Sequence, residues 1–281
     1  MTIVNPIVPT YASRTPYLTP AEYTASPTGV DVSSLVPNGS AQQNADALAQ
    51  TIARASSWVD TECRKILAAT LDTQAGRYRV TADNTIRIPL DNTPIVAVVD
   101  VSVGSSQAGV QLLPATTIPL VEIGRKTITV PVQFPAGAAV AAVVHYVNGY
   151  ANSLLSAAAA AGATAIAVDS TLGIIPGMQV TIYDPGATEQ VTVVAVAGNA
   201  VTLAAALLFQ HQADVAVSAL PPAIKQATVL KTSALIKTRG DSAFVMPSLG
   251  SEPTQKQTLD PSGSGDETIA AELLAPFRRV A

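Results

Sequence analysis

Apolar side chains recur every three or four positions between residues 44 and 67, and polar or charged side chains fill the positions between them. This spacing places the apolar residues on one face of a helix. The pattern therefore predicts an amphipathic helix over 44–67 whose apolar face forms the protein core. The expected core residues on this face are Leu48, Ile52, Val59 and Ile66.

Three further helices are expected. A capping sequence at Thr19 starts a short helix that ends before Pro27. A second long helix is predicted over 222–238, because its apolar residues repeat at helical spacing and a glycine follows it closely. A last short helix is expected within 266–280, where Pro276 interrupts it.

Short β-rich segments replace the helical pattern from residue 72 to residue 150. Proline or glycine separates most of them, which is typical of antiparallel strands joined by turns. The candidate strands are 77–80, 85–90, 95–103, 110–113, 127–132 and 138–147. The pattern predicts a small antiparallel sheet packed on the long helix.

Residues 151–219 differ from the rest of the chain in charge. They contain no lysine or arginine, and their acidic residues are Asp169, Asp184, Glu189 and Asp214. Five strand candidates with glycine and proline turns between them predict a compact barrel or sandwich. These candidates are 164–168, 179–183, 189–196, 200–203 and 214–217.

Together these patterns predict an α+β fold, with helices packed around a small antiparallel sheet and an inserted all-β module. Residues 41–150 and 220–246 are expected to form the core, and 151–219 the insert. The ends, 1–40 and 247–281, have many residues that break regular structure and are expected to be extended arms, the second with a short helix.

The chain carries few charges. Of its 281 residues, 48% are hydrophobic and only 13% are charged, about half the usual charged share, and the net charge is −4. A surface with so few charges protects weakly against association, which favours an oligomer. No run of basic residues stands out in the sequence, so sequence-specific binding to a DNA backbone is not expected.

The sequence offers little chemistry for catalysis or metal binding. Its single cysteine, Cys63, excludes a disulfide within the chain, and its two histidines, His145 and His211, lie far apart. The sequence motifs of serine hydrolases, zinc proteases and nucleotide-binding loops are missing. We therefore expect a protein that is not an enzyme, with no cofactor and no metal site.

Each remaining candidate has a structural interpretation that is favoured over a chemical one. Cys63 lies on the apolar stripe and is expected to be a buried hydrophobic side chain, not a reactive thiol. His145 is expected in the core or at a strand edge, and His211 in a turn. The four acids of 151–219 are expected on a solvated rim; a calcium site is the alternative, although their spacing fits no EF-hand loop.

The first residues show no basic segment followed by an apolar one, so a signal peptide is not expected. The alanine-rich run 156–163 is too short to span a bilayer. We therefore expect synthesis in the cytoplasm and no membrane partner.

Four segments stand out in order along the chain: Tyr17–Tyr23, Ala55–Asp60, Leu235–Asp241 and Ala271–Arg279. Their order, with a β region before the third, resembles the head–tail connector (adaptor) family of tailed bacteriophages. The resemblance covers most of the chain outside 151–219, which the minimal family fold lacks.

The resemblance implies a structural protein of the virion neck. Such adaptors assemble as a ring, commonly a dodecamer, below the portal, and the ring extends the channel through which DNA leaves the head. The implied partners are further copies of the chain, the portal protein and the next neck or tail protein, with DNA as non-specific cargo. The protein would be made in the host cytoplasm and end in the virion.

The resemblance also implies that the C-terminal segment docks on the portal. Apolar side chains would anchor the segment, and arginines would pair with portal acids. The residues expected to dock are Leu273, Leu274, Phe277, Arg278 and Arg279. The alternative is that the final helix packs on its own protomer. The N-terminal arm would lie on a neighbouring subunit or on the next neck protein.

Two other functions stay open at this point. Another virion part, such as a tail terminator or a capsid decoration protein, is the nearer alternative. A bacterial surface or adhesin β-repeat protein is the other, because β modules rich in alanine, threonine and valine are common there.

Overall fold

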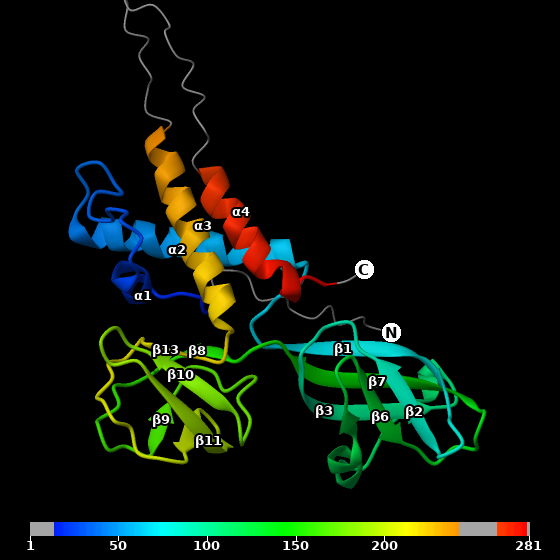
Figure 1. Cartoon of the computed structure of the whole chain (residues 1–281). Coiled ribbons are helices and arrows are strands. Elements are labelled where there is room, and N and C mark those ends of the chain that lie inside the picture. Colours follow the sequence, from blue (N-terminus) through cyan, green and yellow to red (C-terminus); the bar gives the residue numbers. More distant parts are fainter. Residues whose placement is uncertain (1–13, 242–262, 280–281) are drawn as a thin grey trace, which may run out of the picture.

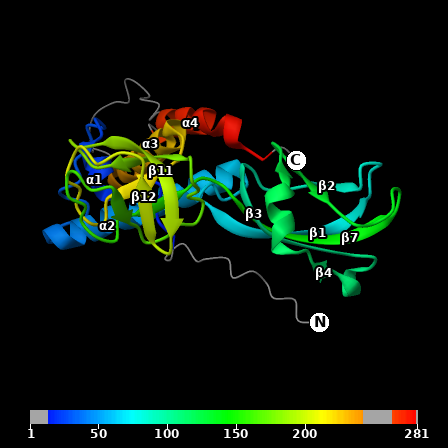
Figure 2. The ribbon, with the colours of Figure 1, turned by 90° about the horizontal axis from the view of Figure 1, so that it is seen from below.

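The computed structural model describes residues 14–241 and 263–279. In these residues the helices form one layer, and two β bodies lie side by side beneath it (Figures 1 and 2). The α-helices of this layer are α1 (Pro20–Ala25), α2 (Ala41–Cys63), α3 (Pro222–Asp241) and α4 (Gly263–Leu274), which the 3₁₀ turn η4 (Ala275–Phe277) follows.

Helix α2 is displaced from its predicted bounds at both ends. It begins earlier because Ser40 caps it, in a reciprocal arrangement with the side chain of Gln43. It ends earlier because Arg64 takes the left-handed conformation, with a φ of 55°. Ile66 therefore lies beyond the helix and is only half-buried, whereas the other three expected core residues of the stripe are buried.

The helices bury their apolar faces mainly against one another. Val59 and Cys63 of α2 pack with Ile224 of α3 and with Ala270 and Leu274 of α4. Earlier in α2, the stripe packs against α3 and the N-terminal segment; the buried residues there are Leu18, Tyr23, Leu48, Ile52, Val229 and Ile236. The helical layer thus has its own core.

The first β body is a sandwich of two antiparallel sheets. The four-stranded sheet has the order β1 (Thr70–Arg79), β7 (Ala139–Asn148), β3 (Ile95–Gly104) and β4 (Gln111–Leu112). The three-stranded sheet has the order β2 (Thr85–Pro89), β6 (Thr127–Pro131) and β5 (Glu122–Ile123), and the 3₁₀ turn η3 (Ala115–Leu120) precedes β5. Alternate residues of both sheets, such as Ile86, Ile128, Val101 and Val144, share one core.

The second β body is a single curled sheet made by residues 152–218. Its strand order is β8 (Asn152–Leu154), β13 (Ala216–Ser218), β10 (Gln179–Tyr183), β11 (Glu189–Ala197), β12 (Ala200–Leu203) and β9 (Ala165–Ala167). The two edge strands approach each other, because Leu155 and Val168 form a bridge beyond them. The curled sheet encloses a core of its own, which includes Val180, Ile182 and Val201.

The predicted fold class is wrong. The described residues form thirteen strands in three sheets and only 28% helix, so the protein is more β-rich than helices around one small sheet. The physical reason is that the sandwich fills its own interior. The strands of 72–150 supply both layers of that sandwich, and the buried cluster between them contains no helical residue among those described.

The predicted N-terminal arm is folded from residue 14 onward. Thr19 caps α1, Pro20 takes the first turn and Glu22 completes the capping box, as predicted. Tyr17 and Tyr23 are buried against the helices of the same protomer. Residues 1–13 of this arm, and residues 247–262 and 280–281 of the predicted C-terminal arm, lie outside the described residues. Across the described ranges, every helix falls short of the length and hydropathy that crossing a membrane requires.

The buried face of α2 makes a direct prediction. Ile52→Asp places a carboxylate where the native side chain is fully buried, so we expect a loss of about 4 kcal/mol in unfolding free energy. Gln50→Asp, on the exposed face of the same helix, is the control and should change stability by less than about 0.5 kcal/mol. Urea denaturation followed by circular dichroism measures both; equal stabilities would show that the packing of α2 is described wrongly.

Candidate functional site

The C-terminal segment packs on its own chain. Leu274 is fully buried between α2 and α3, and Leu273 and Phe277 pack against the same cluster. The ring of Phe277 meets the edge of the Tyr150 ring, with the centroids 6.4 Å apart. This is the arrangement that the sequence left as the alternative to docking on the portal, and these three side chains anchor the segment internally.

The two arginines that follow remain partly exposed. Arg278 forms an ion pair with Glu62 near the end of α2. The guanidinium of Arg279 lies 3.6 Å from the carboxylate of Asp91, and its backbone N–H donates to the carbonyl of Cys63 at 2.9 Å. The five residues predicted to dock thus lie together, but only the two arginines offer charged groups to a partner. Contact with a portal stays a prediction.

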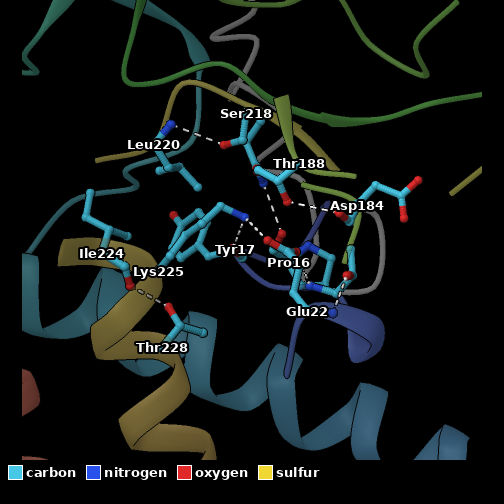
Figure 3. A network of polar contacts seen from close by, with 12 residues as sticks. Pro16, Tyr17, Glu22, Asp184, Thr188, Ser218, Leu220, Ile224, Lys225 and Thr228 are labelled. Carbon is cyan, nitrogen blue, oxygen red and sulfur yellow. Dashed lines mark hydrogen bonds and ion pairs between the residues drawn. The ribbon is translucent and has the colours of Figure 1, made fainter. Parts of the chain in front are cut away.

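A buried ion pair joins the helices to the curled sheet (Figure 3). The Nζ of Lys225 on α3 lies 2.5 Å from Glu22 on α1 and donates to the Tyr17 carbonyl at 3.2 Å. It also lies 3.8 Å from the centre of the Tyr183 ring, at the end of β10. Burial lowers the pKa of Lys225, and the Glu22 carboxylate opposes that effect.

A second buried contact ties the N-terminal segment to the end of α2. The hydroxyl of Tyr17 donates to the carboxylate of Asp60 and accepts the N–H groups of Leu67 and Ala68, both at 3.1 Å. Burial, together with the charge of Asp60, raises the pKa of Tyr17 well above its usual value. The side chain therefore stays neutral and fixes the chain where it leaves α2 for β1.

The curled sheet exposes two apolar side chains, Leu208 and Phe209, which we call the apolar tip. Polar side chains beneath them, Glu189, His211 and Asp184, hold their backbone in place, and we call these three the polar support. Leu208 and Phe209 are among the large apolar side chains that are exposed, at 75% and 44%. Their N–H groups donate to the carboxylate of Glu189 at 3.0 and 3.2 Å. The ring of His211 lies fully buried beside it, 2.8 Å from Glu189 and 3.1 Å from Asp184.

This support corrects two expectations. His211 was expected in a turn, but it forms a β-bridge with Ala159, and its ring is buried beside two carboxylates. Of the four acids expected on a solvated rim, only Asp169 and Asp214 are exposed. Within the described ranges no cluster of histidine, cysteine and acidic side chains is suited to a metal ion.

The other singled-out residues lie apart from this tip. His145 is on β7, in the middle of the four-stranded sheet, and its ring lies 2.6 Å from Asp100 on the neighbouring strand. Cys63 is buried, as predicted, and burial raises the pKa of its thiol to about 11. A thiol with that pKa is protonated at neutral pH and is a poor nucleophile.

A second group of exposed apolar side chains lies on the sandwich. Leu112 of β4, Leu120 of η3 and Ile123 of β5 are 65%, 64% and 46% exposed. Leu112 lies on the edge strand β4 of one sheet, Ile123 on the edge strand β5 of the other, and Leu120 in the connection between these two strands. The two patches, the apolar tip (Leu208, Phe209) and the sandwich patch (Leu112, Leu120, Ile123), therefore lie on different β bodies.

The comparisons with known proteins give no relative: no protein-family model matches the chain, and no curated protein sequence matches it either.

The buried ion pair can be tested by removing one charge. Glu22→Gln keeps the shape and the capping role but leaves Lys225 buried without a counter-charge, so we expect a loss of about 3–5 kcal/mol. Adding Lys225→Met to this variant should restore most of the stability. The exposed pair gives the control: Glu62→Gln should cost less than about 1 kcal/mol. Equal losses of stability for Glu22→Gln and Glu62→Gln in chemical denaturation would contradict the role of Glu22 as the buried counter-charge of Lys225.

The polar support predicts a pH dependence. Burial alone would raise the pKa of Glu189, but hydrogen bonds from Leu208, His211 and Phe209 outweigh it and hold the pKa below its usual value of 4.5. The ionised carboxylate of Glu189 therefore stabilises the fold fully at pH values above the usual pKa of 4.5. This stabilisation is lost as the pH falls through the lowered pKa of the folded state.

Glu189→Gln should accordingly lower the melting temperature at pH 7, and the difference from wild type should shrink in acid. Asp214→Asn, at an exposed position of the same β body, is the control and should leave the melting temperature nearly unchanged at pH 7. Thermal melts followed by circular dichroism, from pH 7 into the acid range below the pKa of Glu189, compare the melting temperatures of the variants with that of wild type. A difference that stays constant from pH 7 to acid would speak against the proposed role of the ionised carboxylate.

Proposed function

We propose that the protein is a structural subunit of a tailed-phage neck, a head–tail connector that works as one copy in a ring. The observation that carries the proposal is the pair of exposed apolar patches on two different β bodies of one weakly charged chain. Exposed apolar patches on a folded protein mark contact surfaces. Ten large hydrophobic side chains are exposed among the described residues, and five of them form these two patches.

Two different patches on one chain suit a contact between unlike surfaces. In such a head-to-tail contact, the apolar tip of one copy meets the sandwich patch of the next. Repeating this contact from copy to copy forms a closed ring when the rotation between neighbouring copies divides a full turn evenly. The two β bodies lie side by side (Figure 1), and each of them carries one of the patches.

The segments that carry the resemblance to connectors meet in space, which supports the same proposal. Tyr17 contacts Asp60, and Leu274 packs in the cluster that holds Val59 and Tyr17. Three of the four segments thus form one unit. For the head side of the ring, we propose that the portal contacts this unit through Arg278 and Arg279, whose charged groups are partly exposed.

DNA would pass through such a ring as non-specific cargo. The net charge of −4 suits a conduit that holds the duplex only weakly, because affinity for DNA depends mainly on neutralising its phosphates. The next neck or tail protein would bind the opposite face of the ring. Both roles are structural and need no catalytic residue.

Breaking the apolar tip tests the proposal. Leu208→Asp combined with Phe209→Asp should cost each interface about 3 kcal/mol, or more than a hundredfold in affinity. Electron microscopy of the purified protein, alone and mixed with portal particles, should then show rings for wild type and none for the double variant. Gln212→Asp, at an exposed polar position nearby, should leave ring formation intact. Rings formed equally well by the double variant, or no rings from wild type under either condition, would overturn the proposal.

A further inference from the structure

A cleft of about 450 Å³ gathers basic side chains from distant parts of the sequence. Lys126 enters it from the turn between β5 and β6, and Arg278 and Arg279 enter it from the end of the described chain. Lys65, just after α2, reaches the same place, because its Nζ donates at 2.7 Å to the carbonyl of Thr93, which lines the cleft. We call these four side chains and their hollow the basic cleft.

Backbone hydrogen bonds hold the parts of the basic cleft together. The N–H of Leu90 donates to the carbonyl of Lys126 at 2.9 Å, which ties the β5–β6 turn to the end of β2. The N–H of Arg279 donates to the carbonyl of Cys63 at 2.9 Å, which ties the chain end to α2. The backbone that carries the basic side chains is therefore positioned before any ligand arrives.

The charges of the basic cleft are only partly balanced. Arg278 pairs with Glu62, and Arg279 lies 3.6 Å from Asp91, a carboxylate that is mostly exposed. The side chain of Lys126 forms neither a hydrogen bond nor an ion pair with any residue that the structure describes. Four basic groups therefore meet two carboxylates, in a protein whose overall charge is negative.

The excess charge acts on Lys65. Burial lowers the pKa of its half-buried ammonium group; Cys63 opposes this effect, and the nearby charges of Lys126 and Arg279 add to it. The neutral carbonyl that it contacts does not cancel these charges. Like charges brought this close repel one another, and an anion placed among them removes the repulsion.

We propose that the basic cleft binds a phosphate group, supplied either by a free phosphate compound or by a nucleic-acid backbone. The oxygens of a phosphate group are arranged tetrahedrally and accept hydrogen bonds in different directions, which suits donors that reach it from several sides. Arginine binds such a group through its planar fork, and lysine through a single point charge. A carboxylate has both oxygens in one plane and would satisfy fewer of these donors.

Inorganic pyrophosphate and a short DNA duplex are the probes, with binding to the full chain measured by titration calorimetry. Lys126→Ala and Arg279→Ala should each weaken binding about tenfold, because each removes a charged hydrogen bond to the ligand. Asp91→Asn should strengthen binding about threefold, since it removes a competing carboxylate. Arg77→Ala on β1 is the matched control: it removes one exposed basic charge away from the cleft and should leave affinity unchanged.

Competition between the probes identifies the source of the phosphate. Pyrophosphate binding without duplex binding supports a free phosphate compound as the ligand. Duplex binding that pyrophosphate displaces, and that weakens as salt rises, supports a nucleic-acid backbone. No binding of either probe overturns the proposal, as does an equal loss of affinity in Arg77→Ala and Lys126→Ala. Binding of a polyglutamate peptide that pyrophosphate fails to displace also overturns it, in favour of a carboxylate site.

Discussion

The buried ammonium group of Lys225 is the constraint on which the arrangement of the other parts depends. A charge this deeply buried is tolerated only when it is paired, and its partners come from three places: Glu22 on α1, the Tyr17 carbonyl and the Tyr183 ring on the curled sheet. Moving α1 would remove the counter-charge of Glu22, and moving the curled sheet would remove the contact with the Tyr183 ring. One side chain thereby fixes the N-terminal segment, α3 and the second β body relative to each other, although each β body has a core of its own.

Features of the fold that depend on residues close together in the sequence could be predicted, and features that depend on distant residues could not. Turn and cap residues sit next to the elements they end, so β10 and β12 fall on their predicted bounds and Thr19 caps α1 as expected. The layers could not be predicted in the same way. The alternation around Ile86 shows that one face is buried, but it does not say whether a helix or another sheet covers that face. Here a second sheet does.

The same limit applies to the candidate site. The sequence could place Cys63 in the core because the helical stripe around it is local. It could not place His211 between two carboxylates or bring Lys126 to Arg279, because these contacts join residues that are far apart along the chain. The weak charge content suggested that the chain has no basic surface, yet folding concentrates four of its basic residues in one cleft. Average composition therefore says little about local charge.

The distribution of polar and apolar groups is unusual in a way that bears on assembly. The strong polar interactions lie inside the chain, at Lys225, Tyr17 and His211, where each of them joins different elements. The outer surface carries apolar patches on both β bodies and few charges. The polar contacts thus hold the parts of the chain together, while the exposed apolar side chains face outward. Such a division suits a subunit whose partner surfaces are extended and whose own shape must not change when those partners bind. The basic cleft is the exception, because its charges are only partly balanced by carboxylates. We therefore expect a small charged ligand to bind there, whereas protein neighbours would contact the apolar patches.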